Sequence, residues 1–156
     1  MIREIERRDY TFSLPLRAIF AGSSQVGKTH LITQILKNQK NLFNTHFTKV
    51  YYFYPELLST CPLAIDFDCE IVSIAGFPDM AQINKFEPGS IVIIDDQSEK
   101  LVKSEDIAVL YKVLSGKRSI SVISVVQNYF LQGKFSQTIK NCSNYVALFR
   151  NCSRWG

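Results

Sequence analysis

The segment from Gly22 to Thr29 constrains the fold of this chain more than any other stretch of its sequence. It reads Gly-Ser-Ser-Gln-Val-Gly-Lys-Thr and fits the pattern G-x-x-x-x-G-K-[ST]. A short apolar run over 17–21 precedes it, and apolar residues at helical spacing over 28–38 follow it. In such a strand–turn–helix setting, consecutive backbone N–H groups gather around phosphate oxygens. We therefore predict a phosphate-binding loop.

Each residue type in this loop is suited to phosphate binding for a physical reason. Gly22 and Gly27 allow a tight backbone path that a Cβ atom obstructs. We expect Lys28 to reach the β- and γ-phosphates of ATP and the Thr29 hydroxyl to bind Mg²⁺. The predicted nucleotide-binding residues are Gly22, Ser23, Ser24, Gln25, Val26, Gly27, Lys28, Thr29 and His30. The side chains of His30 and His46 stand apart from other ligand-type residues, and we interpret both as structural.

The rest of the chain alternates between strand and helix patterns. Apolar or β-branched runs predict strands over 49–54, 70–75, 90–94, 119–126 and 145–149. A helix is expected over 104–115, with Ser104 as its N-cap and Gly116 just past its end. This alternation predicts an α/β fold, a P-loop NTPase (ASCE/RecA-like) three-layer sandwich with a mostly parallel central sheet.

Length and composition are compatible with this fold. The 156 residues, with 46% apolar and 21% charged residues, suit one P-loop ATPase domain over 1–156. The charged N-terminus lacks the apolar core of a signal peptide, and the most apolar stretch, 120–130, is too short to span a bilayer. The four cysteines form no C-x-x-C pair, so we expect reduced thiols and no zinc site in an intracellular, non-secreted protein. The net charge of +4 permits contact with nucleic acid but does not establish it.

An acidic pair follows the strand predicted over 90–94. Asp95 is the residue expected to hold magnesium, and Asp96 is expected to orient or activate the attacking water. Many ATPases have a glutamate at this second position, and aspartate is one methylene shorter. The alternative for such a pair is a solvated turn.

Polar residues also follow the strand predicted over 119–126. Active sites of open α/β sheets lie at the C-terminal ends of the strands. If this strand lies between the phosphate-loop strand and the acidic strand, Gln127 lies near the γ-phosphate and can relay nucleotide state to the loop after it. A polar cap on the strand end is the alternative.

Arginines are the candidates for a catalytic contact between subunits. Arg118 precedes the strand that ends at Gln127, so we place it at the opposite end of the sheet from the nucleotide. In a ring, a neighbour's nucleotide can meet it, which makes Arg118 the first candidate for an arginine finger and Arg150 and Arg154 the rivals. A solvated surface charge is the alternative for each.

The order of these motifs resembles that of the viral genome-packaging ATPases of the FtsK-HerA superfamily. The likeness is greatest to those of Polinton/Maverick elements, adintoviruses and virophage-like elements, with the poxvirus packaging ATPase more distant. It covers most of the chain from 11 to 151, through the phosphate loop, Ile-Ile-Asp-Asp at 93–96, Val-Val-Gln-Asn-Tyr-Phe at 125–130 with Gly-Lys at 133–134, and Tyr-Val-Ala-Leu-Phe at 145–149. Family members usually continue beyond this point, so one expectation is a C-terminally truncated domain.

The resemblance implies a motor that hydrolyses ATP to drive double-stranded DNA into a preformed capsid. It implies a homo-oligomeric ring, contact with a capsid or portal vertex protein, no membrane contact, and a place in the host cell or at the assembling virion. It supports Lys28, Thr29, Asp95, Asp96 and Gln127 in the roles above. A small GTPase is disfavoured because no guanine-reading Asn-Lys-x-Asp segment is present, and no clear arginine-rich lid indicates a small-molecule kinase. The alternative that stays open is a nucleotide-binding regulatory or assembly subunit with slow or no turnover.

Overall fold

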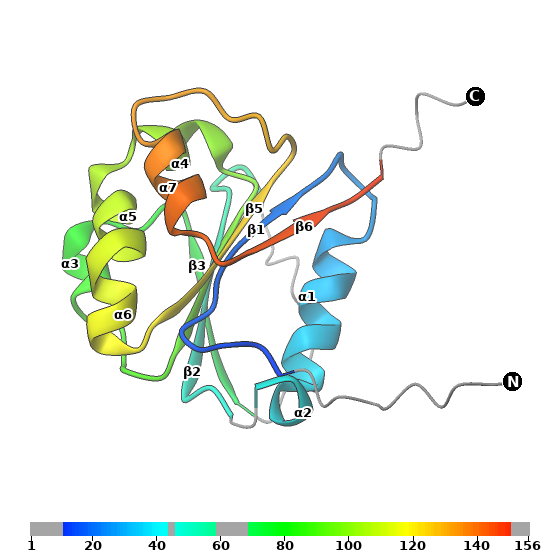
Figure 1. Ribbon diagram of the computed structural model, residues 1–156, viewed down its shortest axis with the longest axis vertical. Helices are drawn as coiled ribbons and strands as arrows, with labels where there is room; N and C mark the ends of the chain where they lie inside the picture. The colour runs from blue at the N-terminus through cyan, green and yellow to red at the C-terminus, as the bar shows by residue number, and fades with distance from the viewer. Residues whose placement is uncertain (1–10, 44–45, 59–68, 151–156) are drawn as a thin grey trace, which may run out of the picture.

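Six apolar segments of the chain form one sheet of parallel strands (Figure 1). They are β1 (Arg17–Ala21), β2 (Lys49–Tyr54), β3 (Glu70–Ala75), β4 (Ile91–Asp95), β5 (Ser121–Val126) and β6 (Tyr145–Leu148). Their order is β3-β2-β4-β5-β1-β6, and each neighbouring pair is parallel. The structure, a computed structural model, describes residues 11–43, 46–58 and 69–150.

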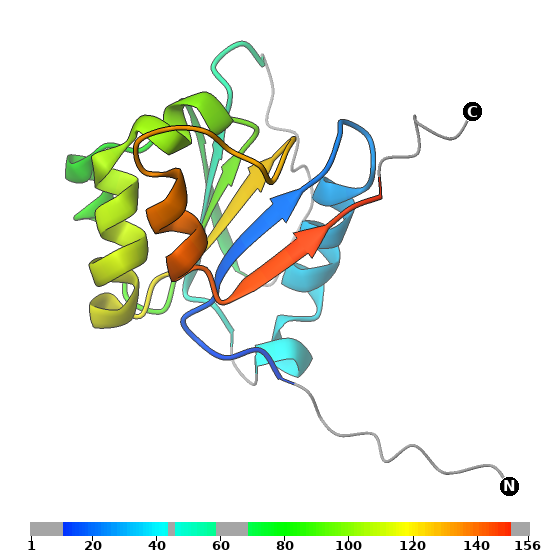
Figure 2. The same ribbon diagram turned by 45° about the horizontal axis from the view of Figure 1, so that its top comes forward.

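Helices cover both faces of this sheet (Figures 1 and 2). One face carries α1 (Lys28–Lys37) and α2 (Gln39–Phe43). The other carries α3 (Met80–Ile83), α4 (Ser98–Lys103), α5 (Glu105–Val109), the π-helical segment η1 (Leu110–Leu114), α6 (Ser115–Arg118) and α7 (Ser136–Cys142). The predicted three-layer α/β sandwich is therefore confirmed, and all strand pairs in the described part of the chain are parallel.

The central strands are apolar on both faces because helices bury both faces. In β4, Ile91 and Ile93 pack in the cluster beneath α1, whereas Val92 and Ile94 pack in the cluster beneath α4 and α5. All four side chains are fully or almost fully buried. Continuous β-branched runs are typical of parallel strands covered in this way, and they predicted this strand to within one residue.

One predicted helix has a different end from the one expected. Ser104 does cap it, since its hydroxyl accepts a hydrogen bond from the Ile107 N–H at 3.1 Å. The prediction that it stops before Gly116 was wrong, because the helix continues through η1 and α6 to Arg118. Ser119, with φ at +53°, then turns the chain toward β5. The Ser115 hydroxyl bonds the Ile120 carbonyl across this turn at 2.6 Å and holds the turn in place of a glycine cap.

Four short helices, α2, α3, α4 and α7, were absent from the sequence interpretation, since four to seven residues carry too little periodicity. The strand boundaries differ from the predicted ones by two residues at most. Within the described ranges, no helix is both long and apolar enough to cross a membrane. The register aligns Ala21 with Val126 and Asp95 with Val125, so β1, β4 and β5 end side by side.

Candidate active site

The loop between β1 and α1 has the backbone that a phosphate cradle requires. Gly27 lies at φ +102° and Gln25 at φ +63°, both in the left-handed region. Gly27 stands immediately before the first turn of α1 and brings no side chain to cap the N–H groups there. Ser24 and Gln25 are exposed, while Val26, Gly27 and Thr29 are half-buried. The loop therefore presents its backbone at the surface, against the positive end of a ten-residue helix.

Gly22 is required where the loop leaves β1. A Cβ atom there would lie 2.6 Å from Phe149 Cβ and 2.9 Å from Val26 Cγ2. The Phe149 N–H donates to the Ala21 carbonyl at 2.9 Å, and the Gly22 N–H donates to the Val126 carbonyl at 3.1 Å. The start of the loop is thus fixed between the ends of β5 and β6, which leaves no room for a side chain.

Lys28 points back across the loop toward the strand ends. Its ammonium donates to the Gly22 carbonyl and, at 3.3 Å, to the Val126 carbonyl. Burial lowers the pKa of this amine, and the negative charges of Asp96 and Asp95 oppose that shift. The lysine therefore lies within the electrostatic reach of both carboxylates that follow β4, as a group that bridges phosphates and acidic residues requires.

Asp95 is the buried acid of the site. Its side chain is held by the Tyr52 hydroxyl of the neighbouring strand β2, which donates to Asp95 Oδ2. Burial raises the pKa of this carboxyl, and so does the charge of Asp96, while the Tyr52 hydrogen bond and Lys28 pull the pKa down. A nearby cation favours the charged form of a carboxylate that is partly desolvated and oriented by one hydrogen bond.

Magnesium fits the donors available here. Mg²⁺ takes oxygen ligands and is usually held by one or two carboxylates together with hydroxyls and phosphates. Asp95 and the Thr29 hydroxyl are the residues that would hold such an ion. No group of three or more His, Cys, Asp or Glu side chains suited to a metal occurs among the residues that the structure describes. This donor set matches a cation shared with a nucleotide rather than a cage made by protein alone.

Asp96 and Gln127 meet at the carboxyl edge of the sheet. Gln127 Nε2 donates to Asp96 Oδ1 at 3.2 Å. The contact follows from the strand order, because β5 lies between β4 and β1, as the sequence argument required. Asp96 is exposed and adopts φ +50°, a left-handed conformation that aspartate tolerates better than most residues. Both side chains are open to solvent, where a water molecule can approach them.

A cavity of about 370 Å³ adjoins Asp96 on the side away from β5. Its lining comes from the residues after β2 and from the start of α4, and includes Glu56, Asp96 and Glu99. Gln97, buried at its edge, donates through Nε2 to the Gly76 carbonyl at 2.7 Å and so ties the β4 end to the β3 end. The end of β4 is therefore held to the end of β3 through Gln97, while Asp96 faces the open cavity.

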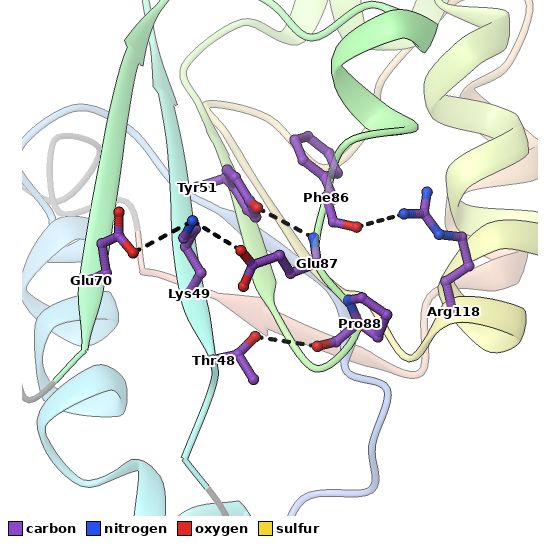
Figure 3. Close-up of polar contacts among 8 residues, drawn as sticks. All are labelled: Thr48, Lys49, Tyr51, Glu70, Phe86, Glu87, Pro88 and Arg118. Carbon is purple, nitrogen blue, oxygen red and sulfur yellow. Dashed lines mark hydrogen bonds and ion pairs between the residues drawn. The ribbon is translucent and has the colours of Figure 1, made fainter.

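Arg118 lies at the opposite end of the sheet, where the sequence placed it (Figure 3). Its guanidinium donates to the carbonyl of Ile83 at the end of α3 and to those of Asn84 and Phe86 after it. Nearby, Lys49 bridges Glu70 and Glu87 from β2 (Figure 3). These contacts give Arg118 a structural function that the sequence did not reveal. Arg150 is exposed at the end of β6, and Arg154 lies outside the described residues.

His30 is exposed on α1, one residue beyond Thr29. The sequence interpretation missed Tyr52 and Phe149, which hold Asp95 and Gly22 in place. The aromatic run over 51–54 gave a signal for a buried strand but not for this contact, because the pairing of β2 with β4 depends on the strand order.

The chain has the α/β fold of P-loop NTPases. In this fold one strand, here β5, lies between β1, which leads into the loop over 22–29, and β4, which ends in the acidic pair. No protein-family model matches the chain. No curated protein matches it either.

Solved structures do match. The chain is similar to the genome packaging NTPase B204 from Sulfolobus turreted icosahedral virus 2 in complex with sulfate, at 11% identity and a TM-score of 0.56, over 88% of this chain and 75% of that one. It is similar to the AMP complex of the same protein at 12% identity and a TM-score of 0.55, over 87% of this chain and 75% of that one. At these identities the likeness shows the fold alone.

Proposed function

We propose that this chain is the subunit of an ATP-hydrolysing motor that moves double-stranded DNA into a viral or virus-like capsid. One observation carries the ATPase part of the proposal: Lys28, Asp95, Asp96 and Gln127, distant in sequence, converge at the adjoining ends of β1, β4 and β5. The packaging part rests on the motif resemblance. It is supported by a fold shared with a protein described as a genome packaging NTPase, for which an AMP complex is known.

Each residue has a distinct task in the proposed reaction. The loop over 22–29 and the Lys28 ammonium bind and orient the β- and γ-phosphates. Thr29 and Asp95 would hold Mg²⁺, which would supply positive charge against the phosphates. Asp96 accepts a proton from the attacking water, and Gln127 positions Asp96 and that water through its amide. An arginine from a neighbouring subunit stabilises charge on the transferring phosphoryl group.

The setting proposed for this reaction is a homo-oligomeric ring around DNA, docked on a capsid or portal vertex protein inside the host cell or at the assembling virion. The second candidate function is a nucleotide-binding regulatory or assembly subunit. Its supporting observation is Asp96, which has a shorter side chain than glutamate and a left-handed backbone that fixes its direction.

The two functions differ in turnover. We expect ATP hydrolysis by the full chain to be slow alone, to rise with protein concentration and to rise further with duplex DNA. Native mass measured under the same conditions should show an oligomer, and Lys28→Ala should set the background rate. A rate at the Lys28→Ala background with and without DNA, together with tight ATP binding, would favour the regulatory subunit. A rate independent of DNA and of protein concentration would contradict the motor.

A further inference from the structure

The charges of this chain are strongly segregated along its sequence. All 14 acidic residues lie within 1–106, although basic residues occur throughout the chain. Residues 107–156 contain no acidic residue and seven basic ones. They are Lys112, Lys117, Arg118, Lys134, Lys140, Arg150 and Arg154. A block of one charge sign within a folded domain points to a polyanionic partner.

Two of these lysines lie in or just after the loop that joins β5 to α7, called here the β5–α7 loop and comprising residues 127–135. Lys134 lies in this loop, and Lys140 lies in α7. The loop crosses the carboxyl edge of the sheet from the end of β5 to α7 (Figure 2). Lys140 Nζ lies 4.9 Å from the Tyr129 ring centroid and 6.0 Å from that of Phe130. Lys134 Nζ lies 5.2 Å from the Phe135 ring centroid. Phe130 itself is 78% exposed.

No carboxylate neutralises these lysines within the described ranges. The ion pairs found there join Lys49 to Glu70 and Glu87, and Lys103 to Glu99. The ammonium groups of Lys134 and Lys140 lie over aromatic rings, which attract a cation without cancelling its charge. Their positive charge therefore remains available to a partner at the surface.

The β5–α7 loop is anchored at both of its ends to the segment that follows the acidic strand. At its start, Gln127 donates to Asp96. At its end, the Phe135 N–H donates to the Val102 carbonyl of α4 at 2.9 Å. Gly133 packs so closely on Val102 that a Cβ atom there would lie 2.4 Å from Val102 Cγ2. Both ends of the loop are therefore in contact with the segment that runs from Asp96 to Val102.

We propose that the exposed part of the β5–α7 loop, with Lys134 and with Lys140 of α7, contacts the phosphate backbone of double-stranded DNA. The proposal rests on the proposed function and assigns the DNA contact of that function to a surface. Ammonium groups bind phosphates as point charges and release counterions from the DNA. Such binding does not depend on base sequence, which suits translocation. The Gln127–Asp96 contact links this surface to the nucleotide site.

The test compares two charge-matched double variants of the full chain. Lys134→Gln with Lys140→Gln removes the proposed contacts, while Lys37→Gln with Lys40→Gln removes the same charge from α1 and α2. Binding of a fluorescent duplex is measured by anisotropy between about 50 and about 200 mM salt. In the variant with Lys134→Gln and Lys140→Gln, two ammonium groups no longer neutralise phosphates. The plot of log affinity against log salt should therefore be less steep than that of wild type by about two. Wild type then loses about tenfold more affinity than the variant over this range.

The control pair should keep the wild-type slope, and both variants should bind ATP like wild type. Equal slopes for the two pairs, with wild type binding duplex, would overturn the surface but leave the motor intact. Wild type that binds ATP but no duplex would overturn both. A loss of capsid-protein binding in the first pair, with unchanged DNA binding, would mark the surface as a protein contact and also overturn the assignment.

Discussion

Asp95 combines its proposed role in holding Mg²⁺ with a cost to stability. Asp95 is 9% exposed, and its carboxylate accepts a hydrogen bond from the Tyr52 hydroxyl. Because burial raises its pKa above the ordinary value of 3.8, the folded state binds a proton more readily than the unfolded state. The stability contributed by this group is complete below the unfolded pKa and is lost as pH rises through the folded pKa. At neutral pH the charge therefore destabilises the fold.

Asp95→Asn should accordingly unfold at a higher temperature than wild type at neutral pH without nucleotide. A gain of about 1 kcal/mol corresponds to about 2–4 °C in a domain of this size. The difference should shrink toward pH 4, where wild-type Asp95 is increasingly protonated, and Mg²⁺-dependent ATP binding should weaken. Calorimetric melting at the two pH values measures this. A variant that melts lower than wild type at neutral pH would show that the carboxylate stabilises the site.

Asp96 is expected to act in turnover rather than in binding. Asp96→Asn keeps the side-chain volume and the left-handed backbone but removes the proton acceptor. The rate of ATP hydrolysis should fall by about 10²–10⁴-fold, the usual contribution of a general base, while ATP affinity stays close to wild type. Glu99→Gln, an exposed carboxylate on α4 paired only with Lys103 among described residues, is the matched control. Equal rates for both variants and wild type would place the base elsewhere.

At the scale of elements, Tyr111 hydrogen-bonds the helix over 105–118 to two strands of the sheet. Tyr111 lies in the π-helical segment and is fully buried. Its hydroxyl lies 2.6 Å from the Ser124 hydroxyl and donates to the Ala18 carbonyl at 3.2 Å, so it connects the helix with both β5 and β1. Burial raises the pKa of this phenol, which keeps it a neutral donor.

Tyr111→Phe should destabilise the fold by about 1–3 kcal/mol, because it leaves the buried Ser124 and Ala18 groups without this partner. Tyr145→Phe is the control, since its exposed hydroxyl accepts a hydrogen bond from the Ser13 N–H near the surface. Denaturant unfolding of both variants provides the comparison. Equal midpoints would mean that Ser124 finds another partner and that the junction has no energetic importance.

Elements with a strong local pattern could be predicted from the sequence, and elements that depend on distant contacts could not. The β4 strand is fully buried and β-branched, so its pattern is unambiguous. The end of the helix at Arg118 depends on the hydroxyl of Ser115, which bonds Ile120, and on three carbonyls in and after α3 that are distant from Arg118 in sequence. Gly116 suggested a helix end, although it lies inside the helix. It is exposed there, and an added Cβ atom would meet nothing, so the position does not require glycine.

At the scale of the whole molecule, the same division applies to the site. The predicted phosphate loop is contiguous, so a local sequence pattern was enough to propose it. The supporting groups come from strands that only the sheet order brings together: Tyr52 from β2 beside Asp95, and Phe149 after β6 beside Gly22. Sequence patterns indicate that such strands exist but do not give their neighbours. The place of Gln127 near the γ-phosphate was predicted only under a condition on strand order, and the sheet fulfils that condition because β5 lies between β4 and β1. The contact between Gln127 and Asp96 was not predicted.

The proposed ring makes a prediction about mixed subunits. Lys28→Ala and a finger variant are each inactive alone, but a mixture contains interfaces that pair an intact site with an intact finger, so activity should partly return. Arg118→Ala and Arg150→Ala are each mixed with Lys28→Ala, and the mixture that regains activity identifies the finger. Because Arg118 also holds three carbonyls, Arg118→Lys serves as its folding control. No recovery in either mixture would contradict a finger at these two positions.

We propose that the loop over 22–29 binds ATP·Mg²⁺ through Lys28. Titration calorimetry of the full chain with ATP·Mg²⁺ tests it most directly, with Lys37→Ala on the same helix as the matched control. Wild type and the control should bind one nucleotide with equal affinity. Lys28→Ala should bind at least about tenfold more weakly, as expected when a charged hydrogen bond to phosphate is lost. Equal affinity of wild type and Lys28→Ala would contradict the assignment of the site.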